Sequence, residues 1–182
     1  MAKVSRIQKS EQEISQTINL DEILGREPTR LERERFIQEA VERMIERTQS
    51  GVDRNGREFK PYTKEYAEEK GVSRSDVDLT LLGDMLLSIQ GESDGSAVQL
   101  KIEGEEAPKA YGHITGFKGH PTIPNGKYKR DFFGLTIDEA TAIANAVRDE
   151  SADQAESQLS VQTPSFNITS ILRNIGFEIG EG

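Results

Sequence analysis

The two histidines, His113 and His120, are the residues best suited to metal or acid–base chemistry. A catalytic zinc site needs three protein ligands, and the nearest acidic residues, Glu105, Glu106 and Asp131, stand at no familiar ligand spacing. The two histidines could also act as acid and base, but they would need a nucleophile to activate. Cysteine is absent, and no serine lies in a nucleophile-elbow pattern. We therefore expect polar or structural roles for the histidines. A metal site of His113, His120 and Asp131 is kept as an alternative.

Other acidic patterns are explained more simply by turns. The D-R-N-G sequence at 53–56 begins like a calcium loop, but position twelve of that loop, where a bidentate glutamate must stand, is Lys64. Asn-Gly instead indicates a tight reversal. Asp76 and Asp78 resemble half of a two-metal carboxylate cluster. They stand without further ligands, so we expect a turn there as well.

Residues 117–130 form the one stretch that is both basic and rich in aromatic residues. Its basic members are Lys118, Lys127, Lys129 and Arg130, and its aromatic neighbours are Phe117, Tyr128, Phe132 and Phe133. Such a stretch can bind a nucleic-acid backbone. Because the rest of the chain is acidic, we expect it to form a subunit interface instead.

The composition excludes several classes of protein. The 182 residues contain 23 basic and 32 acidic side chains, a net charge of −9 that disfavours binding to nucleic acid or to anionic membranes. The absence of cysteine excludes disulfides and thiolate chemistry. No apolar run approaches the ~20 residues of a membrane span, and the first residues lack the apolar core of a secretory signal. We expect an interaction protein rather than an enzyme, from a reducing compartment.

Two capping boxes define the main helices. Thr29 to Glu32 begins a helix that runs to about Gln49, and Thr136 to Glu139 begins one that runs to about Asp149. The apolar stripe of the first helix is Ile37, Val41, Met44, Ile45 and Thr48, widened by Phe36 and Ala40. Shorter helices are predicted after Thr63, through about Lys70, and after Pro108.

The strand signals predict a small sheet. Asp94-Gly95 is typical of a hairpin turn, residues 97–103 alternate apolar and polar side chains, and 130–135 are typical of a short strand. We therefore predict an α+β fold in which a small antiparallel sheet packs against a long N-terminal and a C-terminal helix. Extended arms would flank this domain.

The predicted boundaries are an N-terminal arm at 1–28, a domain at 29–150 and a C-terminal docking arm at 151–182. Residues 150–165 are nearly devoid of apolar side chains and are interpreted as a linker. The candidate interface residues are Phe166, Ile168, Ile171, Leu172 and Ile175 in the C-terminal arm, with Phe117 and Tyr128 in the loop. The low apolar content suggests that burial is completed between chains.

Four segments resemble a known family when taken in order. They are the G-V-D-R-N-G-R-E-F-K-P-Y-T sequence at 51–63, the L-T-L-L-G-D-M-L-L-S-I sequence at 79–89, the Y-G-H-I-T-G sequence at 111–116 and the R-D-F-F-G-L-T sequence at 130–136. Together they resemble the virion-morphogenesis, or tail-completion, proteins of Mu-type and long-tailed phages. The resemblance covers roughly residues 30–150.

This resemblance implies a structural virion protein with no catalytic residues, cofactor or metal. Such a protein forms a ring, for which we expect a hexamer rather than a dodecamer, at the head-proximal end of the tail or in the neck. Its partners would be portal or adaptor proteins and the tail tube or tail terminator, and it would be assembled in the host cytoplasm. Genomic DNA would pass through without specific binding, and the −9 per chain would help if part of it lined the bore.

Two alternatives from other classes stay open. One is a small metal-dependent hydrolase that uses the His113 and His120 loop. The other is a DNA-binding adaptor that uses the basic stretch at 117–130.

Overall fold

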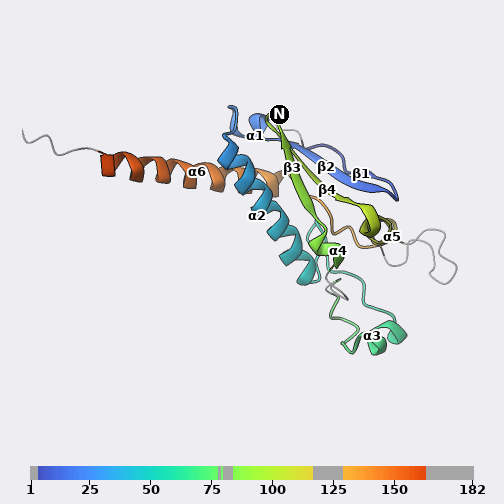
Figure 1. The fold of residues 1–182 in the computed structure, drawn as a ribbon. Helices are drawn as coiled ribbons and strands as arrows, with labels where there is room; N and C mark the ends of the chain where they lie inside the picture. The colour runs from blue at the N-terminus through green and yellow to red at the C-terminus, as the bar shows by residue number, and fades with distance from the viewer. Residues whose placement is uncertain (1–3, 78, 80–83, 117–128, 163–182) are drawn as a thin grey trace, which may run out of the picture. The chain divides into compact units, whose positions relative to one another are not determined.

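The computed structural model describes residues 4–77, 79, 84–116 and 129–162. Its elements, labelled in Figure 1, are β1 (Gln8–Lys9), β2 (Glu13–Asn19), α1 (Leu20–Leu24), α2 (Arg30–Gln49), α3 (Lys64–Lys70), α4 (Asp84–Leu87), β3 (Gln90–Asp94), β4 (Ala97–Glu103), a 3₁₀ turn (Gly104–Glu106), α5 (Ala107–Thr115) and α6 (Ile137–Gln162). The four strands form one antiparallel sheet in the order β1-β2-β4-β3. The predicted α+β class is confirmed.

The prediction of an N-terminal arm at 1–28 is wrong. Strand β2 lies inside the sheet, where Ile14 pairs with Ile102 and Ile18 pairs with Val98. Both isoleucines are fully buried. The polar residues of this strand concealed it. Those at 13, 15, 17 and 19 lie on the face opposite the isoleucines, and Gln16 lies on the core face, where hydrogen bonds to Leu135 satisfy its buried amide.

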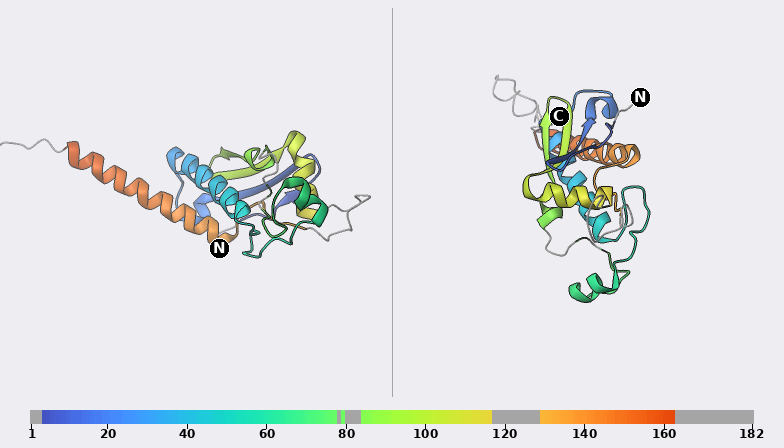
Figure 2. Two further views of the ribbon diagram at one scale, coloured as in Figure 1. Left: turned by 90° about the horizontal axis from the view of Figure 1, so that it is seen from below. Right: turned by 90° about the vertical axis from the view of Figure 1, so that its right-hand side faces the viewer.

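One face of the sheet carries the core. Val98, Leu100 and Ile102 of β4 alternate with partly exposed neighbours, as the sequence predicts for 97–103. Helix α2 packs against β3 and β4, and α5 packs against β2 and β4. The views in Figure 2 show α2 lying beside the sheet, and α3 standing apart from it, beyond the C-terminal end of α2.

Helix α2 forms as its sequence predicts. The Thr29 hydroxyl accepts a hydrogen bond from the Glu32 amide, and the Glu32 carboxylate accepts one from the Thr29 amide, which completes the capping box. The fully buried line is Phe36, Ala40, Met44 and Thr48. Ile37, Val41 and Ile45, which the sequence places in the same stripe, are only partly buried. The apolar face of α2 is therefore wider than the area its own sheet covers.

The predicted strand at 130–135 is absent, since residues 129–136 run as an irregular segment. Side chains from other elements satisfy its backbone instead. The Gln16 amide donates to the Leu135 carbonyl at 2.9 Å and accepts from the Leu135 N–H at 2.8 Å. Arg47 donates to the carbonyls of Phe132 and Gly134 at 2.7 and 2.9 Å.

The tight fit of this segment requires glycine at 134. Gly134 has φ +89°, and a Cβ there would stand 2.7 Å from the Ile7 Cδ1 atom and 2.9 Å from the Gln16 Oε1 atom. Phe132 and Phe133, predicted near a subunit interface, are instead fully buried in the core.

The second capping box is confirmed, because the Thr136 hydroxyl accepts from the Glu139 amide and the Glu139 carboxylate accepts from the Thr136 amide. The helix it starts, α6, does not end near Asp149 but continues to Gln162. The predicted linker at 150–165 is therefore helical over most of its length. Residues 150–163 are mostly polar and contain no glycine or proline. Such residues can continue a helix even without an apolar stripe.

Contacts divide the chain into two units, Met1–Arg148 and Asp149–Gly182. The first unit holds the sheet, the core and helices α1 to α5, and α6 begins in it. The shorter helices α3 and α5 are found where they were predicted, and Thr63 caps α3 by accepting from the Tyr66 amide.

Candidate functional site

The four family-like segments meet at one place in the fold. At this Tyr62–Arg130 junction, Lys60 and Tyr62 come from the first segment, Leu79 from the second, His113 from the third and Arg130 from the fourth. The Arg130 guanidinium lies over the Tyr62 ring, 5.2 Å from its centroid. Both side chains are nearly fully buried.

Hydrogen bonds tie the remaining members to this pair. The Arg130 amide donates to the His113 carbonyl at 2.8 Å, and the Arg130 side chain donates to the Lys60 carbonyl at 3.4 Å. The Tyr62 hydroxyl accepts from the Leu79 amide at 3.3 Å. Leu79 has φ 53°, a left-handed conformation that costs a non-glycine residue of order 1–3 kcal/mol. The junction therefore holds a strained residue in place.

Electrostatics at the junction keep the His113 side chain neutral at pH 7. Burial, with the neighbouring Arg130 and Lys109 charges, lowers the pKa of His113 to about 3. The Arg130 Nη1 atom lies 3.5 Å from His113 Nδ1, which suits a neutral ring whose Nδ1 atom accepts a hydrogen bond from the guanidinium. A base with so low a pKa has little affinity for a proton at pH 7. The contacts at the junction join segments that are far apart in the sequence.

The Asp131 carboxylate is paired with basic side chains. Its carboxylate lies 3.1 Å from Arg54 Nε and 3.8 Å from Lys9 Nζ, and its carbonyl accepts from the Arg54 amide. Burial lowers the pKa of Lys9. Of the alternative metal set, His113 is beside a guanidinium and His120 lies outside the described residues. Within the described ranges, no group of three His, Cys, Asp or Glu residues is placed to hold a metal ion.

The Asp53 turn is confirmed. The Asp53 carboxylate accepts from the amides of Asn55 and Arg57 at 2.8 and 3.0 Å, and Gly56 has φ +74°. This carboxylate therefore serves the reversal. Of the second acidic pair, Asp76 accepts from the Ser75 hydroxyl, and Asp78 lies outside the described residues.

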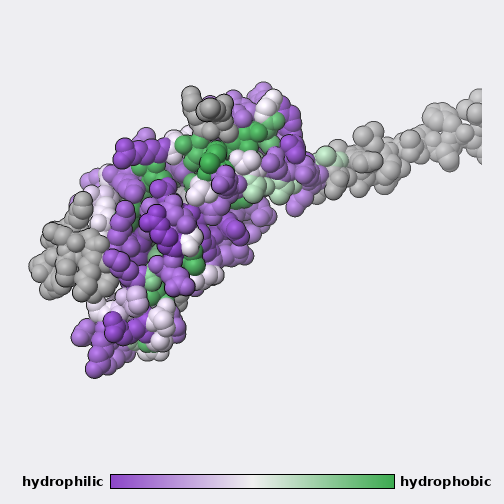
Figure 3. Space-filling view, turned by 180° about the vertical axis from the view of Figure 1, so that it is seen from behind, coloured by the Kyte–Doolittle hydropathy of each residue, from purple (hydrophilic) through white to green (hydrophobic). Residues whose placement is uncertain are grey.

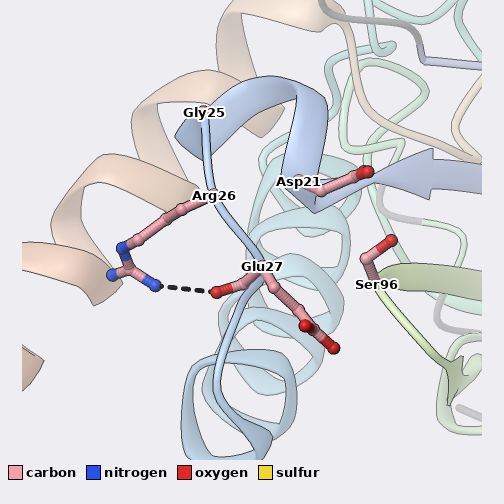
Figure 4. Close-up of a pocket in the computed structure, with 5 residues that line it drawn as sticks. All are labelled: Asp21, Gly25, Arg26, Glu27 and Ser96. Atoms are coloured by element: carbon pink, nitrogen blue, oxygen red, sulfur yellow. Dashed lines mark hydrogen bonds between the residues drawn. The ribbon is translucent and has the colours of Figure 1, made fainter.

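A shallow pocket of about 430 Å³ is lined by Asp21, Gly25, Arg26, Glu27 and Ser96. Figure 4 shows that its polar side chains do not converge on one point. The Arg26 guanidinium is engaged by the Glu27 carbonyl and, at 2.5 and 2.9 Å, by the Glu32 carboxylate. The bond from Arg26 lowers the pKa of Glu32 to about 2. The pocket therefore lies where the chain enters α2, and the Arg26 guanidinium that lines it already has its hydrogen-bond partners.

The described surface is mostly polar. On the face in Figure 3, hydrophilic residues cover most of the area and apolar residues show in separate small areas. Three large apolar side chains are exposed among the described residues, namely Leu31, Leu87 and Ile137. No described helix is long and apolar enough to cross a membrane.

The predicted interface residues are not placed by the structure. Phe166, Ile168, Ile171, Leu172, Ile175, Phe117 and Tyr128 all lie outside the described residues. Within the basic stretch, Arg130 is buried at the junction and is not available to phosphates. Sequence reasoning missed the roles of Gln16 and Tyr62. Nothing in the polar surroundings of Gln16 signals its role, whereas Tyr62 lies in a family-like segment.

No family model, curated protein or solved structure matches this chain.

Proposed function

We propose that this chain is a structural virion protein that forms a ring at the head-proximal end of a phage tail or in the neck. There it would complete the tail and join it to the DNA-filled head. Portal or adaptor proteins would contact one side of the ring, and the tail tube or terminator protein the other. The chain would act by occupying this position, with no chemical step.

The observation that carries this proposal is the meeting of the four family-like segments. Segments that belong to one structural unit of a family are expected to contact one another in the fold. Here residues from 51–63, 79–89, 111–116 and 130–136 contact one another through Tyr62, His113 and Arg130. The segments therefore describe one structural unit, as a shared fold would require.

The charge of the chain is consistent with a conduit for DNA. Each copy carries −9, and a ring multiplies that charge around its bore. Like charge repels the phosphate backbone and lets a duplex pass without sticking. Exposed carboxylates on α2, such as Glu34, Glu42 and Glu46, are candidates for this lining.

The experiment is electron microscopy of the purified full-length chain, with its mass measured by light scattering. We expect rings with a central channel and a mass that is a multiple of 20.3 kDa. Gold-labelled antibody against the chain should bind phage particles at the head–tail junction. A chain that stays monomeric and labels no particle would refute the proposal.

A further inference from the structure

Strand β3 presents an open edge of the sheet. Its only described partner is β4, and the described residues give it no other backbone hydrogen bond. Asp94 and Ala97 close a two-residue turn, so residues 94, 92 and 90 form the hydrogen-bonded pairs with β4. The N–H and C=O groups of Gly91 and Ser93 therefore point outward. Such groups can pair with an additional strand.

An apolar ridge runs beside this edge on α2. A Cβ on Gly91 would stand 2.3 Å from the Ile37 Cγ2 atom, so Ile37 lies directly over β3. Val41 and Ile45 follow on the same helical ridge, and all three are only partly buried. A fifth strand beside β3 would complete the burial of this α2 ridge, which we define as Ile37, Val41 and Ile45.

The C-terminal part of the chain contains a segment with strand character. In the F-N-I-T-S-I-L sequence at 166–172, Phe166 and Ile168 fall on one face of an extended chain together with Ser170 and Leu172, and Asn167, Thr169 and Ile171 fall on the other. Phenylalanine, isoleucine and threonine favour strands. The alternation at 166–169 suits a strand whose Phe166 and Ile168 face is buried.

The segment at 166–172 and the β3 edge differ in the sign of the charges near them. No acidic residue occurs between Glu156 and Glu178, and Arg173 follows the segment directly. Strand β3 itself carries two exposed carboxylates, Asp94 and Glu92, the second of which is paired with Lys101. The segment and the edge are therefore complementary in charge.

We propose that the β3 edge binds residues 166–172 of a second copy of this chain, which add a fifth strand to the sheet. Phe166 and Ile168 would then pack against the α2 ridge. This inference rests on the proposed ring, because an edge of one copy filled by the next copy is a head-to-tail contact, which generates a ring when the rotation closes.

Two full-length variants test this pairing. Phe166→Ser/Ile168→Ser weakens the segment and leaves the edge intact, and Asn167→Ser/Thr169→Ser is its matched control on the opposite strand face. Ser93→Pro removes an outward N–H and leaves the segment intact, and Ser93→Ala is its control, which keeps that N–H. Circular dichroism and thermal melting show that each variant is folded.

We expect both control variants to assemble and both test variants to be monomeric in light scattering. An equimolar mixture of the two test variants should form heterodimers and nothing larger, because the intact edge of one variant can bind the intact segment of the other and neither partner can then add a further copy. In a mixture with wild type, each test variant can make only one link, so it shortens the assembly instead of joining a complete ring. Test variants that assemble like wild type would overturn the inference.

Hydrogen exchange locates the contact directly. In the wild-type oligomer, the amides of Gly91 and Ser93 should exchange at least about tenfold more slowly than in Phe166→Ser/Ile168→Ser, with the β4 amides unchanged. Equal exchange would overturn the pairing, and slow exchange in a wild-type monomer would assign the segment to its own chain and overturn the second copy. If Ser93→Pro still forms rings, the strand pairing is refuted while the proposed function stands. Protection of β3 in assemblies that never label phage particles would refute the proposed function alone.

Discussion

Replacing Gly91 with alanine measures how closely α2 lies on the edge strand. The added Cβ would stand 2.3 Å from the Ile37 Cγ2 atom and 3.1 Å from its Cγ1 atom. Isoleucine in a helix has one strongly preferred χ1 rotamer, so Ile37 cannot turn aside cheaply. Overpacking of this kind costs about 1–3 kcal/mol, which exceeds the ~0.4–1 kcal/mol gained by stiffening the unfolded chain. We expect the free energy of unfolding to fall by about 1–2 kcal/mol.

The assay is urea and thermal unfolding followed by circular dichroism, where this loss corresponds to a fall in Tm of about 2–8 °C. Ser93→Ala, on the same strand face, is the control and should change stability by less than ~0.5 kcal/mol. In an Ile37→Ala background the γ carbons are gone, so Gly91→Ala should cost little there, with a coupling of about 1–2 kcal/mol. A stabilised Gly91→Ala, or additive single effects, would refute the close contact.

Three further predictions concern other parts of the fold. Because burial lowers the pKa of His113 to about 3, stability should fall as the pH drops from about 6.5 toward 3, and His113→Asn should flatten that part of a stability–pH curve. Arg47→Met removes the close ion pair with Glu139 and the donors to the Phe132 and Gly134 carbonyls, so urea unfolding should show a loss of about 1–3 kcal/mol, of which Arg47→Lys recovers only part. Thr29→Ala removes the cap on the Glu32 amide, and the same assay should show a loss of about 0.5–2 kcal/mol.

Helix starts were predictable because capping is local. The hydroxyl and carboxylate that satisfy the first amides lie three residues apart, as at Thr29 and Thr136, so the sequence alone defines them. The β3–β4 hairpin was predictable for the same reason. Its turn residues and alternating strand lie within a few positions of one another.

Strand β2 and the 129–136 segment were not predictable in this way. Gln16 looks like an ordinary exposed glutamine until it is placed beside Leu135, more than a hundred residues later. The strand-like run of Phe132 and Phe133 is apolar because the segment is buried, and burial does not require a sheet. Each error involves a partner that is distant in sequence.

The Tyr62–Arg130 junction was partly predictable. The family-like segments contain all its members, but no local pattern states that they touch. The segment proposed to bind the β3 edge was identified from its apolar residues. Their spacing alone does not distinguish a strand from an amphipathic helix, since Ile168, Ile171, Leu172 and Ile175 also follow the helical period.

The central position of β2 has a consequence for biosynthesis. Ile14 meets its cross-strand partner, Ile102, only about 90 residues later in the chain. At a translation rate of ~5–20 residues per second, an emerging β2 waits roughly 4 to 18 s for β4 to be made. Until then two isoleucines destined for the interior face water on the nascent polypeptide, and a ribosome-associated chaperone could bind this stretch during that time.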